Sequence, residues 1–407
     1  MGFDLYSAGA GSKGVLELKR KLGYDQLLSQ LNERKACIEW AEYKRAHPEC
    51  SSKLFIDSGA YTAHTKGKEV DVDEYIEFIN SIDDQVFTFA QVDHIPGVWG
   101  QPKTPEQLAE APILSWENYL YMVNKVNSPK KLQPIFHQGE DFKYLKQMLE
   151  YRYDQNCLDK TAIGQPIDYI GISCNKELST NEWIDWFTKV FKIIRDSSNP
   201  NVKTHAFGMT SLKVLEQFPF TSADSTSWVR SAGFGNILVG YTSIYTSSRN
   251  QIDNGHIKNI SPAIRESISQ IATKYGYSLF EVIDEATTPE RNKILIKIDE
   301  LVNTYIPTLR KAGLEVTVPD YAGNYIYDIK EKLKENLING FGIYVKQDIF
   351  NDEVKNKVKQ VIQKFIEELD DTNPSGEIRC LFNICSLNEW ANNYAYRGTD
   401  EYEEDLW

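Results

Sequence analysis

The chain has 407 residues, of which 41% are hydrophobic and 25% charged, and its formal net charge at pH 7 is -13. This length exceeds a typical single domain, so we expect one large domain with additions, or a large and a smaller domain. The acidic balance excludes broad, nonspecific attraction to nucleic acid, which needs a basic surface, but it permits a local basic rim. No run of eighteen apolar residues occurs, so no membrane association is expected.

The N-terminus lacks the basic and apolar regions of a secretory signal. The six cysteines are scattered and form no CxxC pattern, which is typical of reduced thiols. We therefore expect a cytoplasmic protein (in the host cytoplasm if a phage encodes it) without a bound cofactor. The acidic run Asp400–Asp405 is interpreted as a solvated terminus.

In chain order, eight segments are predicted to be strands, and each ends in small or polar residues. They are Phe3–Ser7, Gln26–Gln30, Lys53–Asp57, Val86–Asp93, Leu132–Gln138, Ile167–Ser173, Lys203–Met209 and Thr221–Ser225. Several are continuous apolar runs, as expected for strands buried on both faces.

Helical patterns lie between these strands, at Asp71–Ile82, Ser115–Val126 and Thr180–Arg195, the last with Thr180 as its expected N-cap. Alternating strands and helices predict an α/β fold, and eight strands favour a closed TIM (β/α)8 barrel. An open doubly wound sheet is the alternative. The segment Gly9–Gly14 comes nearest to the phosphate loop of such a sheet, but no acidic residue closes a second strand about twenty residues later.

The pattern changes after Trp228. Loops and short strands are expected first, followed by helices at Ser261–Tyr275, Thr288–Ala312 and Val354–Leu369, and by a further helical turn at Leu279–Glu285. We therefore predict a barrel domain at 1–245 and a mainly helical C-terminal region, with the acidic tail, at 246–407.

Acids or amides close four of the predicted strands: Asp57 the third, Asp93 the fourth, Gln138 the fifth and Asp224 the eighth. The C-terminal ends of parallel barrel strands meet at one face, which is where barrel enzymes hold their chemistry. A single Asp at a strand end is often only a helix cap. Two carboxylates in one pocket, however, suit displacement at a sugar carbon, because one can attack while the other moves protons.

Ser58 and Gly59 are small, so a ligand can approach the backbone there. His137 and His205 close the fifth and seventh strands, and each is also explained as a hydrogen-bonded core histidine. Because the histidines lie on separate segments without a compact ligand motif, no metal site is predicted. Basic residues near the strand ends are candidates for phosphate contacts: Lys13, Lys66, Lys68 and Arg230.

Taken together, these motifs resemble the tRNA-guanine transglycosylase superfamily, and more closely its phage branch, which places 7-deazaguanine bases into DNA. The resemblance covers residues 1–240. Its motifs are Asp57-Ser58-Gly59-Ala60-Tyr61, Gln138-Gly139, Tyr169-Ile170-Gly171-Ile172-Ser173, Phe207-Gly208-Met209 and Ala223-Asp224-Ser225.

The resemblance implies a TIM barrel and a base-exchange reaction. Asp224 would attack C1′ of the target nucleoside and expel guanine, and Asp57 would take the proton of the incoming base. Asp93 would pair with the N1 and 2-amino edge of the purine, and Gln138 with its O6. The remaining substrate contacts are expected from Ser58, Gly59, Tyr61, Gly171, Ser173, His205 and Met209, with Tyr61 a candidate for stacking on the base.

The chain departs from the family in two respects. Ala60 and Glu140 replace the second glycines of two motifs, and no CxCxxC zinc motif follows Asp224, since the next cysteine is Cys380. A helical region takes the place of that zinc subdomain, which favours DNA over tRNA as substrate. Alternatives are a tRNA-guanine transglycosylase, a glycosidase or ribosyltransferase acting on small nucleosides, and a non-catalytic nucleic-acid-binding barrel. Homo-oligomerisation is left open.

Overall fold

We describe a computed structural model of the chain, covering residues 3–11, 13–174, 178–209, 211–240, 242–246, 255–257, 259–274, 288–321, 326–347, 350–371 and 375–394. The chain forms two compact units. The first contains Met1–Ser231, Leu238–Thr242 and Asn383–Trp407, and the second contains Ala232–Ile237 and Ser243–Phe382. The helical turn expected at Leu279–Glu285 and the acidic run Asp400–Asp405 lie outside the described residues.

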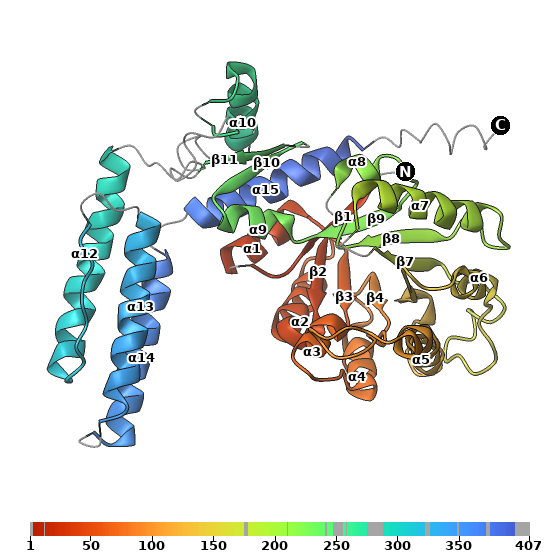
Figure 1. The fold of residues 1–407 in the computed structure, drawn as a ribbon, viewed down its shortest axis with the longest axis horizontal. Coiled ribbons are helices and arrows are strands. Elements are labelled where there is room, and N and C mark those ends of the chain that lie inside the picture. The colour runs from red at the N-terminus through yellow and green to blue at the C-terminus, as the bar shows by residue number, and fades with distance from the viewer. Residues whose placement is uncertain are drawn as a thin grey trace. The chain divides into compact units, whose positions relative to one another are not determined.

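The first unit is a parallel barrel of nine strands in the order β5-β4-β3-β2-β1-β9-β8-β7-β6 (Figure 1). The strands are β1 Asp4–Ala8, β2 Gln26–Ser29, β3 Leu54–Asp57, β4 Thr88–Ala90, β5 Leu132–Gln133, β6 Ile135–His137, β7 Tyr169–Ser173, β8 Lys203–Phe207 and β9 Ser222–Ser225. Each predicted strand overlaps an observed one, and the predicted TIM-like α/β barrel is confirmed.

Pro134 explains why the sheet has nine strands where eight were expected. It separates β5 from β6, and it has no backbone N–H with which to continue a ladder. On one side of this proline β5 pairs with β4, and on the other side β6 pairs with β7. The predicted segment Leu132–Gln138 therefore occupies one strand position of the barrel, and Pro134 divides it in two. With this divided strand the barrel is nearly closed.

The helices of the barrel unit follow the strands, as the alternating pattern predicts. They are α1 Lys13–Leu22, α2 Gln30–Ala46, α3 Ala60–Thr65, α4 Val72–Ile82, α5 Pro105–Val123, α6 Phe142–Glu150, α7 Thr180–Arg195, α8 Leu212–Leu215 and α9 Ser227–Gly233. Two expectations need correction. Ser179, not Thr180, caps α7 in a capping box with Glu182, and α5 begins ten residues before Ser115 because Thr104 and Gln107 form a capping box there.

Aromatic side chains fill the barrel interior. Tyr6, Phe55 and Phe207 pack together with small and aliphatic residues of neighbouring strands, and the ring of His205 lies 4.5–5.8 Å from these three rings in edge-on contacts. This packed layer closes the barrel below its C-terminal end.

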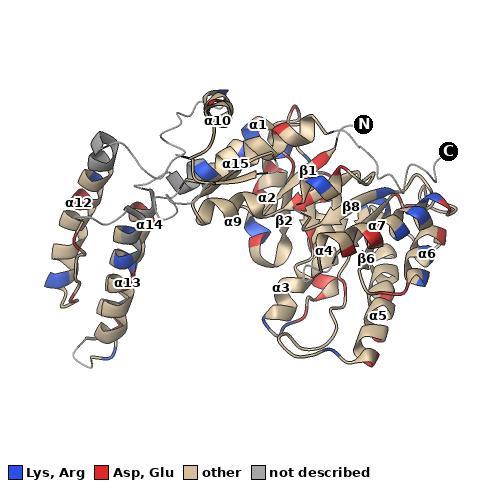
Figure 2. Cartoon of the chain, turned by 45° about the horizontal axis from the view of Figure 1, so that its top comes forward, with Lys and Arg blue, Asp and Glu red and all other residues tan. Residues whose placement is uncertain are grey.

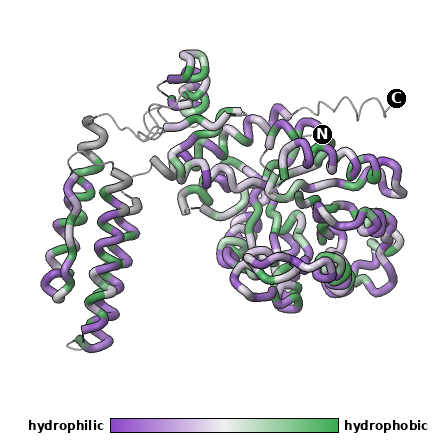
Figure 3. The backbone as a smooth tube through the Cα atoms, in the orientation of Figure 1, coloured by the Kyte–Doolittle hydropathy of each residue, from purple (hydrophilic) through white to green (hydrophobic). Residues whose placement is uncertain are grey.

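The second unit contains α10 Pro262–Lys274 and three longer helices, α12 Thr288–Lys311, α13 Ile326–Tyr344 and α14 Asp352–Asp371. Hydrophobic and hydrophilic residues alternate along the three longer helices (Figure 3), as in amphipathic helices that share a core. Their common core includes Ile306, Leu333 and Phe365. The mainly helical character expected after residue 245 is observed in the described residues.

The last helix, α15 Ser375–Asn392, follows α14, and residues from Asn383 onward belong to the barrel unit. Trp390 donates to Glu216 at 2.9 Å, and the Tyr394 hydroxyl donates to the Leu215 carbonyl at 3.0 Å. The boundary drawn at residue 245 does not include this return of the chain. The two short strands β10 Asn236–Val239 and β11 Thr242–Tyr245 pair in a separate sheet. Among the described helices, none combines the length and apolar character that crossing a membrane requires.

Candidate active site

Asp57 and Asp224 lie at the C-terminal ends of β3 and β9, and Asp93 follows β4. Their charges interact. Burial, then the neighbouring carboxylate of Asp93, raise the pKa of Asp57 to about 7, with smaller contributions from Asp224 and Glu33 and an opposing hydrogen bond from the Gly59 N–H. Three acids from distant parts of the sequence are thus gathered at one end of the barrel, as the strand-end pattern predicts.

Asp224 is held by a chain of buried hydrogen bonds. Its Oδ1 accepts from the Gly208 N–H at 2.7 Å and lies 3.2 Å from His205 Nε2. His205 Nδ1 lies 2.6 Å from the Ser222 hydroxyl, which in turn lies 2.5 Å from the Tyr169 hydroxyl. All these groups are satisfied if Tyr169 donates to Ser222, Ser222 to His205, and His205 to Asp224.

The strand pattern explains this chain. Ser222 and Asp224 are two residues apart on β9, so their side chains project from the same face, and Ser222 is the register partner of His205 on β8. Both bonds to Asp224 use Oδ1. Within the described part of the chain Oδ2 accepts no hydrogen bond.

Asp93 forms a second polar group with His137, at the end of β6, and Glu140, in the loop that follows. Its Oδ2 lies 3.0 Å from His137 Nε2, and Glu140 accepts from the backbone N–H of His137 at 3.2 Å. Burial alone would lower the pKa of His137, but the hydrogen bond to Asp93 and the carboxylates of Asp93 and Glu140 raise it overall. Burial also raises the pKa of Glu140.

Glu33, on α2, accepts backbone hydrogen bonds from the ends of two neighbouring strands. Its Oε1 accepts from the Ala10 N–H at 2.6 Å, after β1, and its Oε2 accepts from the Ser29 N–H at 3.1 Å, at the end of β2. The helix departs from regular geometry at Glu33, where φ is -130°. This carboxylate therefore fixes backbone beside the site.

Two of the predicted glycines are explained by packing. Gly59 has a φ of +81°, and a Cβ atom there would lie 2.5 Å from the Cβ of Leu31. At Gly171 a Cβ atom would lie 2.3 Å from the ring of Phe207. Larger residues are excluded at both positions by neighbouring side chains. Phe207 lies over Gly171, the residue expected to line the pocket.

The other predicted contact residues occupy different depths. Ser58, His205 and Met209 are buried, and both ring nitrogens of His205 are engaged, which places this histidine behind Asp224. Ser173 and Gln138 are partly buried at neighbouring strand ends, with the Gln138 N–H donating to the Ser173 carbonyl at 2.9 Å. Tyr61, by contrast, is 61% exposed. Lys66 and Lys68 are exposed beyond α3, and the side chain of Lys13 lies outside the described part.

Sequence reasoning missed Ser222, Glu33 and the pairing of His137 with Asp93. The alternation of β9 could have placed Ser222 beside Asp224. The bond to His205, however, depends on the register between two strands, which no local pattern gives. Glu140 was noted only as a substitution for a glycine, and its contact with the His137 backbone depends on the loop conformation.

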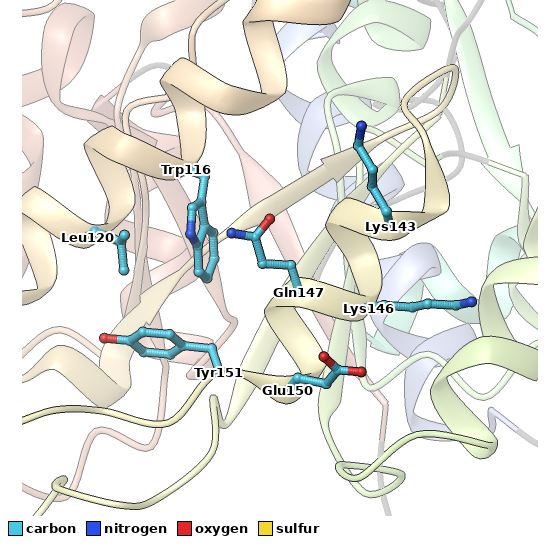
Figure 4. A pocket seen from close by; sticks show the side chains of 7 residues that line it. All are labelled: Trp116, Leu120, Lys143, Lys146, Gln147, Glu150 and Tyr151. Carbon is cyan, nitrogen blue, oxygen red and sulfur yellow. The ribbon is translucent and has the colours of Figure 1, made fainter.

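An open cavity of about 510 Å³ lies elsewhere on the barrel, between α5 and α6. Trp116, Tyr151, Lys143 and Lys146 are among its lining residues (Figure 4). None of the predicted site residues lines it, and its acid, Glu150, is exposed. This groove is therefore separate from the strand-end carboxylates.

No protein-family model matches the chain, and no curated protein is similar to it in sequence. Among the described residues, no group of three or more His, Cys, Asp and Glu side chains is arranged to hold a metal ion. The assignment of a function must therefore depend on the strand-end geometry.

Proposed function

We propose that the chain is a base-exchange transglycosylase that replaces guanine in DNA with a 7-deazaguanine through a covalent bond between Asp224 and the sugar. The observation that carries the proposal is the meeting of Asp57, Asp93 and Asp224 at one barrel end, where Asp57 has a pKa of about 7. A group with this pKa can both give and take a proton near neutrality.

The chemistry follows from the unequal environments of the two carboxylates. Oδ2 of Asp224 attacks C1′, the bond from C1′ to N9 of guanine breaks, and the departing base receives a proton from Asp57. The incoming deazapurine then loses its N9 proton to Asp57 and attacks C1′, which breaks the ester bond and frees Asp224. The exchange is redox-neutral and needs no further co-reactant.

Fixed hydrogen bonds support this role for Asp224. The Gly208 N–H and His205 hold Oδ1 in place, so little reorganisation is needed when positive charge develops on the sugar. In the proposed exchange Asp93, which pairs with His137, accepts from the N1 and 2-amino groups of the purine. Because a base inside a duplex cannot reach this site, the target nucleotide must be flipped out or single-stranded.

Nucleoside analysis tests the proposal. DNA and tRNA from cells that express the chain and are supplied with a 7-deazaguanine base are digested and examined by mass spectrometry. We expect the deazapurine nucleoside in DNA. Its presence only in tRNA would change the substrate, and its absence from both would contradict the proposal. Turnover of a free nucleoside without polymer would favour a small-molecule ribosyltransferase instead.

A further inference from the structure

An exposed aromatic pair lies beside the strand-end site. Tyr61 is on α3, and Trp99 is in the loop between β4 and α5; they are 61% and 54% exposed. Their ring centroids are 5.6 Å apart at an interplanar angle of 87°. The neighbouring Val98 is also 61% exposed. Such a cluster of large apolar side chains on a surface indicates an interaction site.

Lysines occur on the same two segments as this pair. Lys66 and Lys68 follow α3, and Lys103 lies at the end of the loop that carries Trp99; all three are exposed. Basic segments occur on these two loops (Figure 2). After burial, the charge of Lys103 lowers the pKa of His64, and it opposes the rise in the pKa of His137. The ammonium group of Lys103 is thus close both to α3 and to the candidate active site.

Aromatic rings interleaved with lysines, in a chain with a net charge of -13, favour one class of partner. Surfaces that bind single-stranded nucleic acid combine rings on which bases stack with cations that contact phosphates. In the edge-on pair the edge of one ring meets a face of the other, so the pair covers only one ring face, and both side chains are more than half exposed. A generic acidic partner would account for the lysines but not for the exposed ring faces.

We propose that Trp99 and Tyr61, with Lys66, Lys68 and Lys103, form a docking surface for the single strand that flanks the target nucleotide. Nucleotides next to the target stack on the rings while the lysines hold their phosphates. The proposal rests on the proposed function, because it places the strand so that one base reaches the carboxylates. Beyond the proposed function, the docking proposal names the surface that binds the nucleic acid and requires that the substrate be single-stranded there.

The surface is tested by the binding of a fluorescent oligothymidylate of twelve nucleotides to the full chain. This test is separate from base exchange, since the oligonucleotide contains no guanine. The double variant Trp99→Ala, Lys103→Gln should bind about tenfold more weakly, because one stacked base and one phosphate contact are lost. Lys103→Gln alone should reduce the slope of log affinity against log salt by about one. Trp99→Phe, which keeps a ring, should retain most of the affinity.

The groove between α5 and α6 supplies a matched control. Trp116→Ala, Lys143→Gln removes the same residue types from another surface of the barrel and should leave the affinity unchanged. A parallel measurement with an oligouridylate shows whether RNA binds with the same affinity as the oligothymidylate. Equal losses in the two double variants, or no binding by the wild-type chain, would overturn the docking surface.

Self-association that Trp99→Ala abolishes, with oligonucleotide binding intact, would show a protein contact instead and would also overturn the proposal. Normal docking by a protein that never modifies nucleic acid would contradict the proposed exchange alone. The two hypotheses can therefore fail independently.

Discussion

The two ends of the barrel each contain an aspartate whose pKa is about 7, yet their surroundings differ. At the N-terminal end, burial raises the pKa of Asp25, Asp4 adds to the rise, and Lys53 opposes it through both its backbone N–H and its charge. Lys53 also forms an ion pair with Asp4. At the C-terminal end, Asp57 faces the carboxylates of Asp93 and Asp224, and the opposing contribution is a backbone hydrogen bond from Gly59.

A raised pKa alone therefore does not identify a catalytic group. Asp25 receives a hydrogen bond from the Lys53 N–H at 2.8 Å and belongs to a group of opposite charges that joins β1 to β3. Asp57 belongs to a group of like charges at the end where barrel enzymes act. The comparison predicts that substitutions at the two ends will have similar effects on stability, and that only those at the C-terminal end will reduce activity.

The largest expected effect is that of Asp224→Asn. The amide keeps an oxygen that can accept from the Gly208 N–H, so the fold should be retained, while base exchange falls by at least about a thousandfold because the nucleophile is lost. Exchange assays with labelled base and denaturing gels of protein with oligonucleotide measure this. An adduct that survives denaturation should form with wild type and not with the variant. Its persistence in Asp224→Asn would assign the attack to another residue.

Asp57→Asn should have the next largest effect, slowing exchange by about a hundredfold or more because proton transfer is lost. In the wild type, the rate at which the preformed covalent adduct takes up the incoming base should rise with pH through about 7, as Asp57 becomes the base. In the variant the rate should be flat over this range. Single-turnover rates between pH 5 and 9 provide the measurement, and an unchanged profile would exclude Asp57 from the proton transfer.

Much of the barrel is predictable because its information is local. Segments that end in small or polar residues, several of them continuous apolar runs, locate the barrel strands, and the strand ends locate Asp57, Asp93 and Asp224 on one face. The interruption at Pro134 was not anticipated, because a proline within an apolar run gives no indication that its two sides pair with different neighbours. The N-cap of α7 was misplaced by one residue, since Ser179 and Thr180 are both good capping residues.

What sequence could not supply is contact between elements. The bond between His205 and Ser222 depends on the register of β8 against β9, and that between His137, at the end of β6, and Asp93 depends on the conformation of the loop after β4. Burial likewise separates residues that look equivalent in a motif. Tyr61 and Ser58 belong to one motif, but the first is exposed and the second is buried.

Ser222→Ala should have a smaller effect on exchange, about tenfold, because it acts on Asp224 only through His205. Without the serine hydroxyl, His205 Nδ1 loses its partner, and the imidazole is free to change its tautomer or tilt. We expect kcat to decrease and KM to stay unchanged, since no contact to the substrate is removed. Steady-state kinetics measure this division. A rise in KM alone would show that Ser222 shapes the binding site rather than positioning the nucleophile.

Asp25→Asn should leave exchange unchanged and alter only stability. The folded-state pKa of Asp25 is raised above its unfolded value, so folding favours the protonated form. The contribution of Asp25 to the free energy of unfolding is fully present below pH 4 and is lost as pH rises to about 7. The neutral asparagine still accepts from the Lys53 N–H, so the variant should be more stable than wild type above pH 7, by about 1–2 kcal/mol. Urea unfolding at pH 5 and pH 8 tests the sign, because the advantage of the variant must be larger at pH 8. If Asp57→Asn gains stability in the same way but loses exchange, the two ends of the barrel differ in function despite the equal pKa values of their aspartates. A loss of exchange in Asp25→Asn would contradict this difference in function.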